Sequence, residues 1–258
     1  MKLRKSRILL LVLATAAVFF MLFAAVSILG RDSWVNFDLE RITGCDRTSV
    51  IYDCHDKEIL SLHGTQDRIW VSLDDLPPHL LDAFISAEDA RFYDHEGVDV
   101  IRIAGAIIAD IKAGGYVQGA STISQQLIKL SHLSSEKTIS RKAEEAVLAY
   151  QMERRCSKQD ILEMYLNYVY FGGGYYGVEA AAMGYFGIHA KEVNLAQSAM
   201  LAGILKSPSS YAPHIDYEAS IKRRNNILNL MNQYGYISAD ELADALAERP
   251  IIVHGNTQ

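Results

Sequence analysis

The sequence predicts a mainly α-helical protein with a short β element in front, and three observations support this fold class. Half of the 258 residues are apolar and 22% are charged, a composition typical of one globular domain with a real core. Apolar side chains recur at helical spacing, for example between residues 101 and 111. Capping-box spacing marks helix starts at Ser157 with Asp160 and at Ser238 with Glu241.

A membrane anchor is expected near the N-terminus. Residues 8–30 contain no charged side chain, and a helix of this length can cross a hydrocarbon core of about 30 Å. Basic residues precede it in the tail over residues 1–7, so we expect a cytoplasmic N-terminus and an outward-facing domain. A cleaved signal peptide is the alternative, but its apolar core is usually only about 7–15 residues long.

The β element is expected at residues 49–71, within a linker region over residues 31–71. Runs of β-forming residues flank a polar turn at residues 53–57. The turn contains Cys54 and His55, but no second ligand group lies at a useful spacing, so we interpret it as a solvated turn and predict no metal site. Whether Cys45 and Cys54 pair stays open.

The helical domain is expected over residues 72–250, with a short tail over residues 251–258. Glycine-containing or proline-containing breaks divide it at residues 112–121, 171–177 and 205–213. Without the four basic residues of the first 30 positions, 21 basic side chains remain against 31 acidic ones. This acidic balance disfavours nucleic-acid binding, and an anionic substrate would need a local basic cluster.

Two adjacent acids, Glu88 and Asp89, form the first candidate site. A helix over residues 80–92 would place Glu88 one turn from Phe84 and Phe92, on a partly apolar face. A carboxylic acid among aromatic side chains suits proton transfer near neutral pH. An ordinary solvated acid pair at a helix end is the alternative, and spacing alone does not decide between them.

Two further stretches carry groups that suit an anion. Residues 119–130 combine a glycine loop, hydroxyls, two glutamines and a lysine. Residues 134–148 add basic side chains, with Arg141 and Glu145 on one helix face. Simple capping and a surface salt bridge of about 0.3–0.5 kcal/mol are the structural alternatives.

A glycine pattern at residues 172–177 matches a dinucleotide-binding fingerprint only formally. It follows a predicted helix instead of a strand, so we interpret it as close packing between two helices. Glu163, on the preceding helix, is interpreted as a structural acid.

Together these stretches resemble the peptidoglycan glycosyltransferase domain, glycosyltransferase family 51. That domain occurs alone in monofunctional transglycosylases and as the N-terminal half of class A penicillin-binding proteins. The resemblance covers about residues 50–250. The matching positions are Glu88, Asp89, Phe92, His95 and Gly97, then Gly119, Ser121, Thr122, Gln125, Gln126 and Lys129, then Arg141, Lys142 and Glu145, and a later helix pattern between residues 161 and 187.

The resemblance implies an inverting enzyme that polymerises lipid II into β-1,4-linked glycan and releases undecaprenyl pyrophosphate. Glu88 would be the general base, and Glu145 a second acid that orients the substrate or the basic cluster. Substrate-binding residues would be Asp89, Phe92, His95, Gly119, Ser121, Thr122, Gln125, Gln126, Lys129, Lys137, Arg141 and Lys142. Among these, Lys129, Lys137 and Arg141 would hold the pyrophosphate, whereas Asp89 and His95 would hold their loop.

The resemblance also implies a lysozyme-like large lobe and a smaller, membrane-associated jaw lobe, which we place near residues 98–116. The chain departs from the family pattern at Gln197, where glutamate is frequent, and at Lys137, where arginine is common. No transpeptidase domain precedes the end at Gln258, so we expect a monofunctional polymerase or a truncated class A protein.

The expected partners are lipid II, the growing lipid-linked glycan, the membrane and other cell-wall synthesis proteins, without nucleic acid. The protein would cross the bacterial cell membrane once. No cofactor is expected, although a Mg²⁺ or Mn²⁺ ion bound to the substrate would leave no ligand set in the sequence. The alternatives are a lytic, muramidase-like enzyme and an inactive scaffold. Glycan hydrolysis needs no basic cluster, which favours the polymerase.

Overall fold

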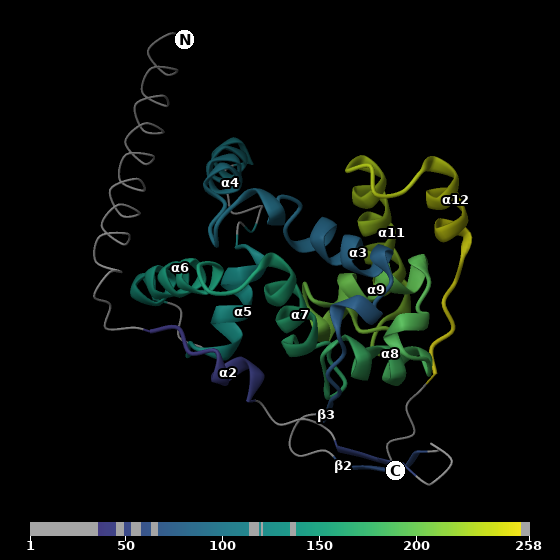
Figure 1. The fold of residues 1–258 in the computed structure, drawn as a ribbon. Helices are drawn as coiled ribbons and strands as arrows, with labels where there is room; N and C mark the ends of the chain where they lie inside the picture. Colours follow the sequence, from purple (N-terminus) through teal and green to yellow (C-terminus); the bar gives the residue numbers. More distant parts are fainter. Residues whose placement is uncertain are drawn as a thin grey trace, which may run out of the picture.

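The computed structural model describes residues 36–44, 49–52, 58–62, 67–113, 119, 121–134 and 138–253. This part of the chain is mainly α-helical, as predicted (Figure 1). The predicted anchor, Cys45, Cys54, the turn between the first strands and Lys137 lie outside the described residues. No helix among the described residues is both long and apolar enough to cross a membrane.

A buried helix lies at the centre of the helical body. This helix, α9 (Leu195–Ile204), is buried on nearly every side and packs against α3 (Pro78–Glu88) and α11 (Tyr217–Gln233). A helix that is apolar all round belongs in a core. The surrounding helices are α5 (Ile123–Ser131), α6 (Ile139–Glu153), α7 (Lys158–Tyr168), α8 (Val178–Phe186) and α12 (Ala239–Ala247).

Shorter helical segments complete this body. They are α2 (Glu40–Thr43) and α10 (Pro208–Tyr211), with the 3₁₀ turns η2 (Leu73–Asp75), η3 (Phe92–Asp94) and η4 (Ala190–Glu192). The capping boxes that the sequence predicts form at Ser157 and Ser238, and another forms at Asn194; each side chain accepts a hydrogen bond from the backbone three residues on. Each such cap stabilises its helix by about 1 kcal/mol.

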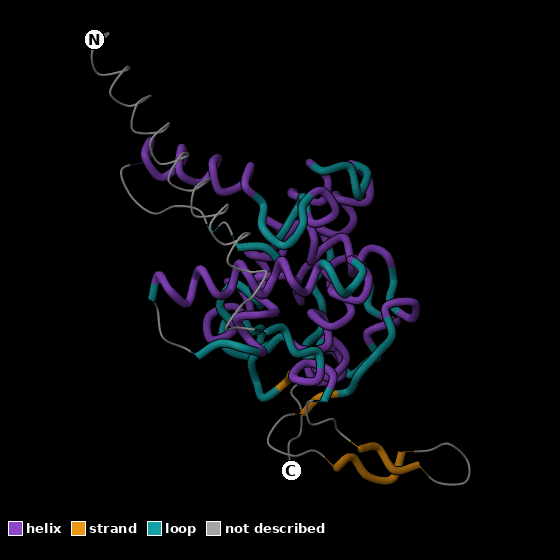
Figure 2. Tube along the Cα trace, turned by 60° about the vertical axis from the view of Figure 1, so that its left-hand side comes forward, coloured by secondary structure: helices purple, strands orange, loops and turns teal. Residues whose placement is uncertain are grey.

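The predicted β element is present as an antiparallel hairpin. Strand β1 (Ser49–Tyr52) pairs with β2 (Glu58–Leu62), and Ser49 lies opposite Leu62 (Figure 2). A second pairing was not predicted: β3 (Asp67–Arg68) runs parallel to β4 (Tyr175–Tyr176). Two-residue strands carry no alternation that could be read from sequence.

The glycine pattern at residues 172–177 is a site of close backbone packing, as interpreted from the sequence. Gly177 has a φ of 86°, and a Cβ there would lie 2.8 Å from the backbone oxygen of Asn167 at the end of α7. Only glycine fits both the left-handed φ and this contact. Glu163 is structural too, since it accepts hydrogen bonds from Trp70 Nε1 at 3.1 Å and from Leu73 N at 2.9 Å.

The helix predicted over residues 80–92 ends earlier, at Glu88. Asp89 leaves the helical conformation, with a φ of −156° and a ψ of 71°. Its carboxylate accepts a hydrogen bond from Ile123 N, at the start of α5, at 3.0 Å. This long-range contact ends the helix, and Phe92 becomes buried in η3 instead of the same helix.

Helix α4 (Val100–Ala113) extends away from the helical body in both views (Figures 1 and 2). Val100, Ile101 and Ile108 are exposed on it. Its position is where the sequence places the jaw. The division into two lobes, like the domain boundaries, stays a prediction.

Candidate active site

Glu88 lies at the C-terminal end of α3 with a partly exposed side chain. Its Oε2 atom accepts a hydrogen bond from Gln126 Nε2 at 2.8 Å. Gln126 belongs to α5, and its Oε1 atom accepts a hydrogen bond from the hydroxyl of Tyr165, on α7, at 3.2 Å. Three helices therefore meet at one carboxylate through side-chain hydrogen bonds.

Tyr165 is fully buried. Burial raises the pKa of this phenol well above its usual value, and the charges of Glu88 and Asp89 raise it further. The hydroxyl therefore keeps its proton at neutral pH and acts as a donor toward Gln126.

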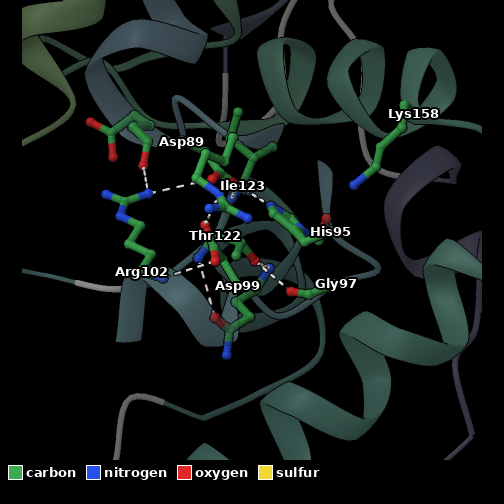
Figure 3. Close-up of polar contacts among 12 residues, drawn as sticks. Asp89, His95, Gly97, Asp99, Arg102, Thr122, Ile123 and Lys158 are labelled. Atoms are coloured by element: carbon green, nitrogen blue, oxygen red, sulfur yellow. Dashed lines mark hydrogen bonds and ion pairs between the residues drawn. The ribbon is translucent and has the colours of Figure 1, made fainter. Parts of the chain in front are cut away.

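Asp89, next to Glu88, is completely buried and surrounded by donors (Figure 3). Its Oδ2 atom lies 3.0 Å from His95 Nε2 and accepts the hydrogen bond from Ile123 N, while its Oδ1 atom lies 3.4 Å from Arg102 Nη1. The side chain therefore connects the end of α3 to η3, α4 and α5. Both carboxylate oxygens of Asp89 therefore have partners within the protein.

The loop after Asp89 is fixed by aromatic and backbone contacts. Phe92 is buried, with the ring of His95 edge-on at 6.3 Å and Lys158 Nζ 4.4 Å from its ring centroid. Gly97 has a φ of 84°, and a Cβ there would lie 2.9 Å from the backbone of Ala149 in α6. Gly97 is thus required by both its conformation and its close approach to α6.

Thr122 and Gln125 form the cap of α5. Thr122 Oγ1 donates to the carbonyl of Gly97 at 2.6 Å and accepts from Gln125 N at 3.1 Å, while Thr122 N donates to Gln125 Oε1 at 3.2 Å. Both side chains are buried. Helix capping, the structural alternative for this stretch, is therefore observed at Thr122 and Gln125.

A charged cluster lies on α6, which packs against α5. Glu145 is buried between Arg141, whose Nη1 lies 3.5 Å away, and Lys142, which forms an ion pair with it. Lys142 Nζ also donates to Ser121 Oγ at 2.7 Å. Lys129 and Gly119 are exposed, on and before α5. The structure thus joins Ser121, Arg141, Lys142 and Glu145 in one cluster.

Arg102, on α4, was not predicted from the sequence as a site residue. Its guanidinium donates to the backbone carbonyl of Glu88 and to that of Gly119, the latter at 3.4 Å, in addition to its contact with Asp89. Asp99 Oδ1 accepts from Arg102 N at 2.9 Å at the start of the helix. The sequence feature that could have indicated Arg102 is that it is a single basic residue in the otherwise apolar stretch IRIAGAIIA.

A metal could be held by several carboxylates, histidines or cysteines in one place. Within the described ranges, no three such side chains gather in a way that could hold an ion.

Comparison with known proteins identifies the family. The family model described as Transglycosylase matches residues 55–232. Penicillin-binding protein 1A of Streptococcus oralis is 43% identical over 202 residues, which cover 77% of this chain and 32% of that protein. Penicillin-binding protein 1A of Haemophilus influenzae is 47% identical over 202 residues, which cover 78% of this chain and 24% of that protein.

A crystal structure of the Haemophilus influenzae protein covers 82% of this chain and 21% of its own, with 27% identity and a TM-score of 0.47. The chain spans about a third or less of the length of these relatives. Because the family model matches more than half of its residues, the chain belongs to the transglycosylase family, the peptidoglycan glycosyltransferases of family 51.

Proposed function

We propose that this protein polymerises lipid II into β-1,4-linked glycan strands and releases undecaprenyl pyrophosphate. The observation that carries the proposal is the partly exposed carboxylate of Glu88, which Gln126 holds at 2.8 Å at the end of a core helix. A general base needs this combination of access and fixed orientation. Membership of the transglycosylase family supports the same reaction.

Glu88 accepts the proton from the 4-hydroxyl of the N-acetylglucosamine on an incoming lipid II. The resulting oxygen attacks the anomeric carbon of the growing glycan as the bond to the pyrophosphate oxygen breaks. The electron pair of that bond leaves with undecaprenyl pyrophosphate, and attack from the opposite face inverts the configuration. No covalent enzyme intermediate is required.

The leaving pyrophosphate needs fixed positive charge. Lys129, Lys137, Arg141 and Lys142 are the residues that we assign to it. The buried Glu145 holds Arg141 and Lys142 in place, so its part in the reaction is to orient this cluster. An arginine held in this way offers a planar pair of donors to a phosphate.

Substrate access follows from the same arrangement. The exposed apolar side chains of α4, together with the predicted anchor over residues 8–30, would bring the site to the surface of the bacterial membrane where the lipid carrier lies. The catalytic domain would then face the extracytoplasmic side, beside other cell-wall synthesis proteins.

Polymerisation of labelled lipid II by the detergent-solubilised full chain tests the proposal. We expect long glycan from the wild type and a loss of about 10²–10⁴-fold in Glu88→Gln, the usual contribution of a general base. Glu96→Gln is the matched control, because Glu96 is an exposed acid in the following loop.

Three other outcomes would contradict the proposal. Full activity in Glu88→Gln would show that another group is the base. Breakdown of preformed glycan without synthesis would indicate the lytic enzyme, and no reaction in either assay would indicate the scaffold.

A further inference from the structure

We propose that Tyr165 is a positioning residue for Glu88 and acts through the side-chain amide of Gln126. This inference rests on the proposed function, because it concerns the efficiency of Glu88 as the base. In the sequence, Tyr165 falls within the helix pattern between residues 161 and 187, without a role of its own. The structure instead places its hydroxyl 3.2 Å from Gln126 Oε1, and Gln126 Nε2 2.8 Å from Glu88.

A glutamine amide can rotate so that its oxygen and nitrogen exchange places. Tyr165 opposes this rotation, since its protonated hydroxyl donates to the oxygen end while the NH₂ group faces Glu88. The opposite orientation would direct an amide oxygen at the carboxylate and forfeit the N–H donor that holds it. The tyrosine thus stabilises the orientation in which the amide donates to the Glu88 carboxylate.

The hydroxyl is well suited to this role because its own position is fixed. Tyr165 is fully buried on α7, and α7 packs against α5. Burial, with the nearby charges of Glu88 and Asp89, keeps the phenol protonated far above neutral pH. The packed core, and not the loop that follows Glu88, therefore fixes the orientation of the Glu88 carboxylate.

The opposing explanation is that the hydroxyl merely satisfies its own hydrogen-bonding needs in the core. The two explanations differ in what they predict for turnover. A structural hydroxyl would change the stability of the fold, whereas a positioning hydroxyl would change kcat through Gln126 and leave KM unchanged.

The experiment is a double-mutant cycle in the full, detergent-solubilised chain, with kcat and KM for lipid II measured below the unfolding temperature of each variant. Tyr165→Phe keeps the ring and removes only the hydroxyl. We expect it to lower kcat about 3–10-fold, the range of one hydrogen bond, without changing KM. In the background of Gln126→Met, we expect Tyr165→Phe to have no further effect on kcat.

Tyr185→Phe is the matched control. Tyr185 is also buried, and its hydroxyl donates to the backbone carbonyl of Phe171 at 2.9 Å. We expect this variant to retain wild-type kcat. A lower kcat in Tyr165→Phe could then not be attributed to the loss of a buried tyrosine hydroxyl in general.

Wild-type kcat in Tyr165→Phe would overturn this inference alone, while Glu88→Gln remained inactive. Additive effects of Tyr165→Phe and Gln126→Met would also overturn it, because the hydroxyl would then not act through the amide. Absence of glycan from the wild type, or full activity of Glu88→Gln, would overturn the proposed function and this inference with it.

Discussion

Glu88 and Asp89 are neighbours in the sequence, but their carboxylates have different surroundings. The helix ends between them, so Glu88 stays partly exposed and Asp89 turns into the interior. Asp89 meets a backbone N–H, an imidazole and a guanidinium there, and a buried carboxylate is stable only with such partners. Adjacent acids in a motif can therefore separate into one accessible and one buried, organising group.

Asp89→Asn tests this organising role. The substitution keeps the shape but removes the charge that Arg102 and His95 face, so we expect the free energy of unfolding to fall by about 1.5–3 kcal/mol, the worth of a hydrogen bond to a charged group. Chemical denaturation measures the loss, with Asp94→Asn as the control because Asp94 is exposed in the same loop. Equal stability of the two variants would contradict the account.

The sequence indicated Glu88, Asp89 and the charged cluster of α6 one by one as candidates, because their types and spacing are visible along the chain. It did not identify their partners. Tyr165 lies 39 positions from Gln126 and Arg102 lies 14 positions from Glu88. Such pairs depend on how helices pack, which no local pattern encodes.

At the scale of elements, local signals predicted most helix starts but not every helix end. The capping boxes were predictable, since a cap and its partner are only three residues apart. The end of α3 was not, because Ile123 is distant in sequence. The sequence also did not predict that the segment before α2 packs against α5 and α6. In the structure, Phe37 stacks on His132 with 5.4 Å between ring centroids, and Phe37 N donates to Gln151 Oε1 at 3.0 Å.

The docking of this segment should depend on pH through His132. Burial lowers the pKa of His132 below its ordinary value, and this effect outweighs the hydrogen bond to the Asp38 backbone and the charge of Asp38, which raise it; the charge of Arg41 lowers it further. The folded state therefore prefers the neutral ring, so its contribution to stability is complete above the unfolded pKa of about 6.5 and is lost as the pH falls below that value. We expect the backbone amides of residues 36–44 to lose protection on acidification.

Hydrogen exchange at about pH 7.5 and about pH 5, corrected for intrinsic rates, measures this loss. His132→Gln is the comparison, since it cannot titrate in that interval. The same pH response in His132→Gln would show that another group is responsible.

Across the whole molecule, the segment after α12 is tied back to the helical body. Tyr217, in α11, donates its hydroxyl to the carbonyl of Pro250 at 2.9 Å, and Val253 N donates to the carbonyl of Tyr185 at 2.8 Å. Arg224 is buried on α11 and donates to the carbonyls of Leu246 and Glu248. These contacts connect the last described residues to α8 and α11, on which the central α9 rests.

Arg224→Met should therefore weaken the fold as a whole and leave the chemistry intact. The methionine keeps much of the aliphatic stem but no donor for the carbonyls at the end of α12. A loss of about 1.5–3 kcal/mol corresponds to a fall in Tm of roughly 3–12 °C for a domain of this size. Lys222→Met is the control, because Lys222 is exposed on the same helix.

Glycan synthesis by Arg224→Met, measured below its Tm, should equal that of the wild type, since these contacts lie outside the cluster around Glu88. A fall in kcat without a fall in Tm would contradict this structural role, because Arg224 would then influence the reaction more than the fold. An unchanged Tm together with unchanged activity would show that water can satisfy the carbonyls at the end of α12, and that these contacts contribute little to the stability of the helical body.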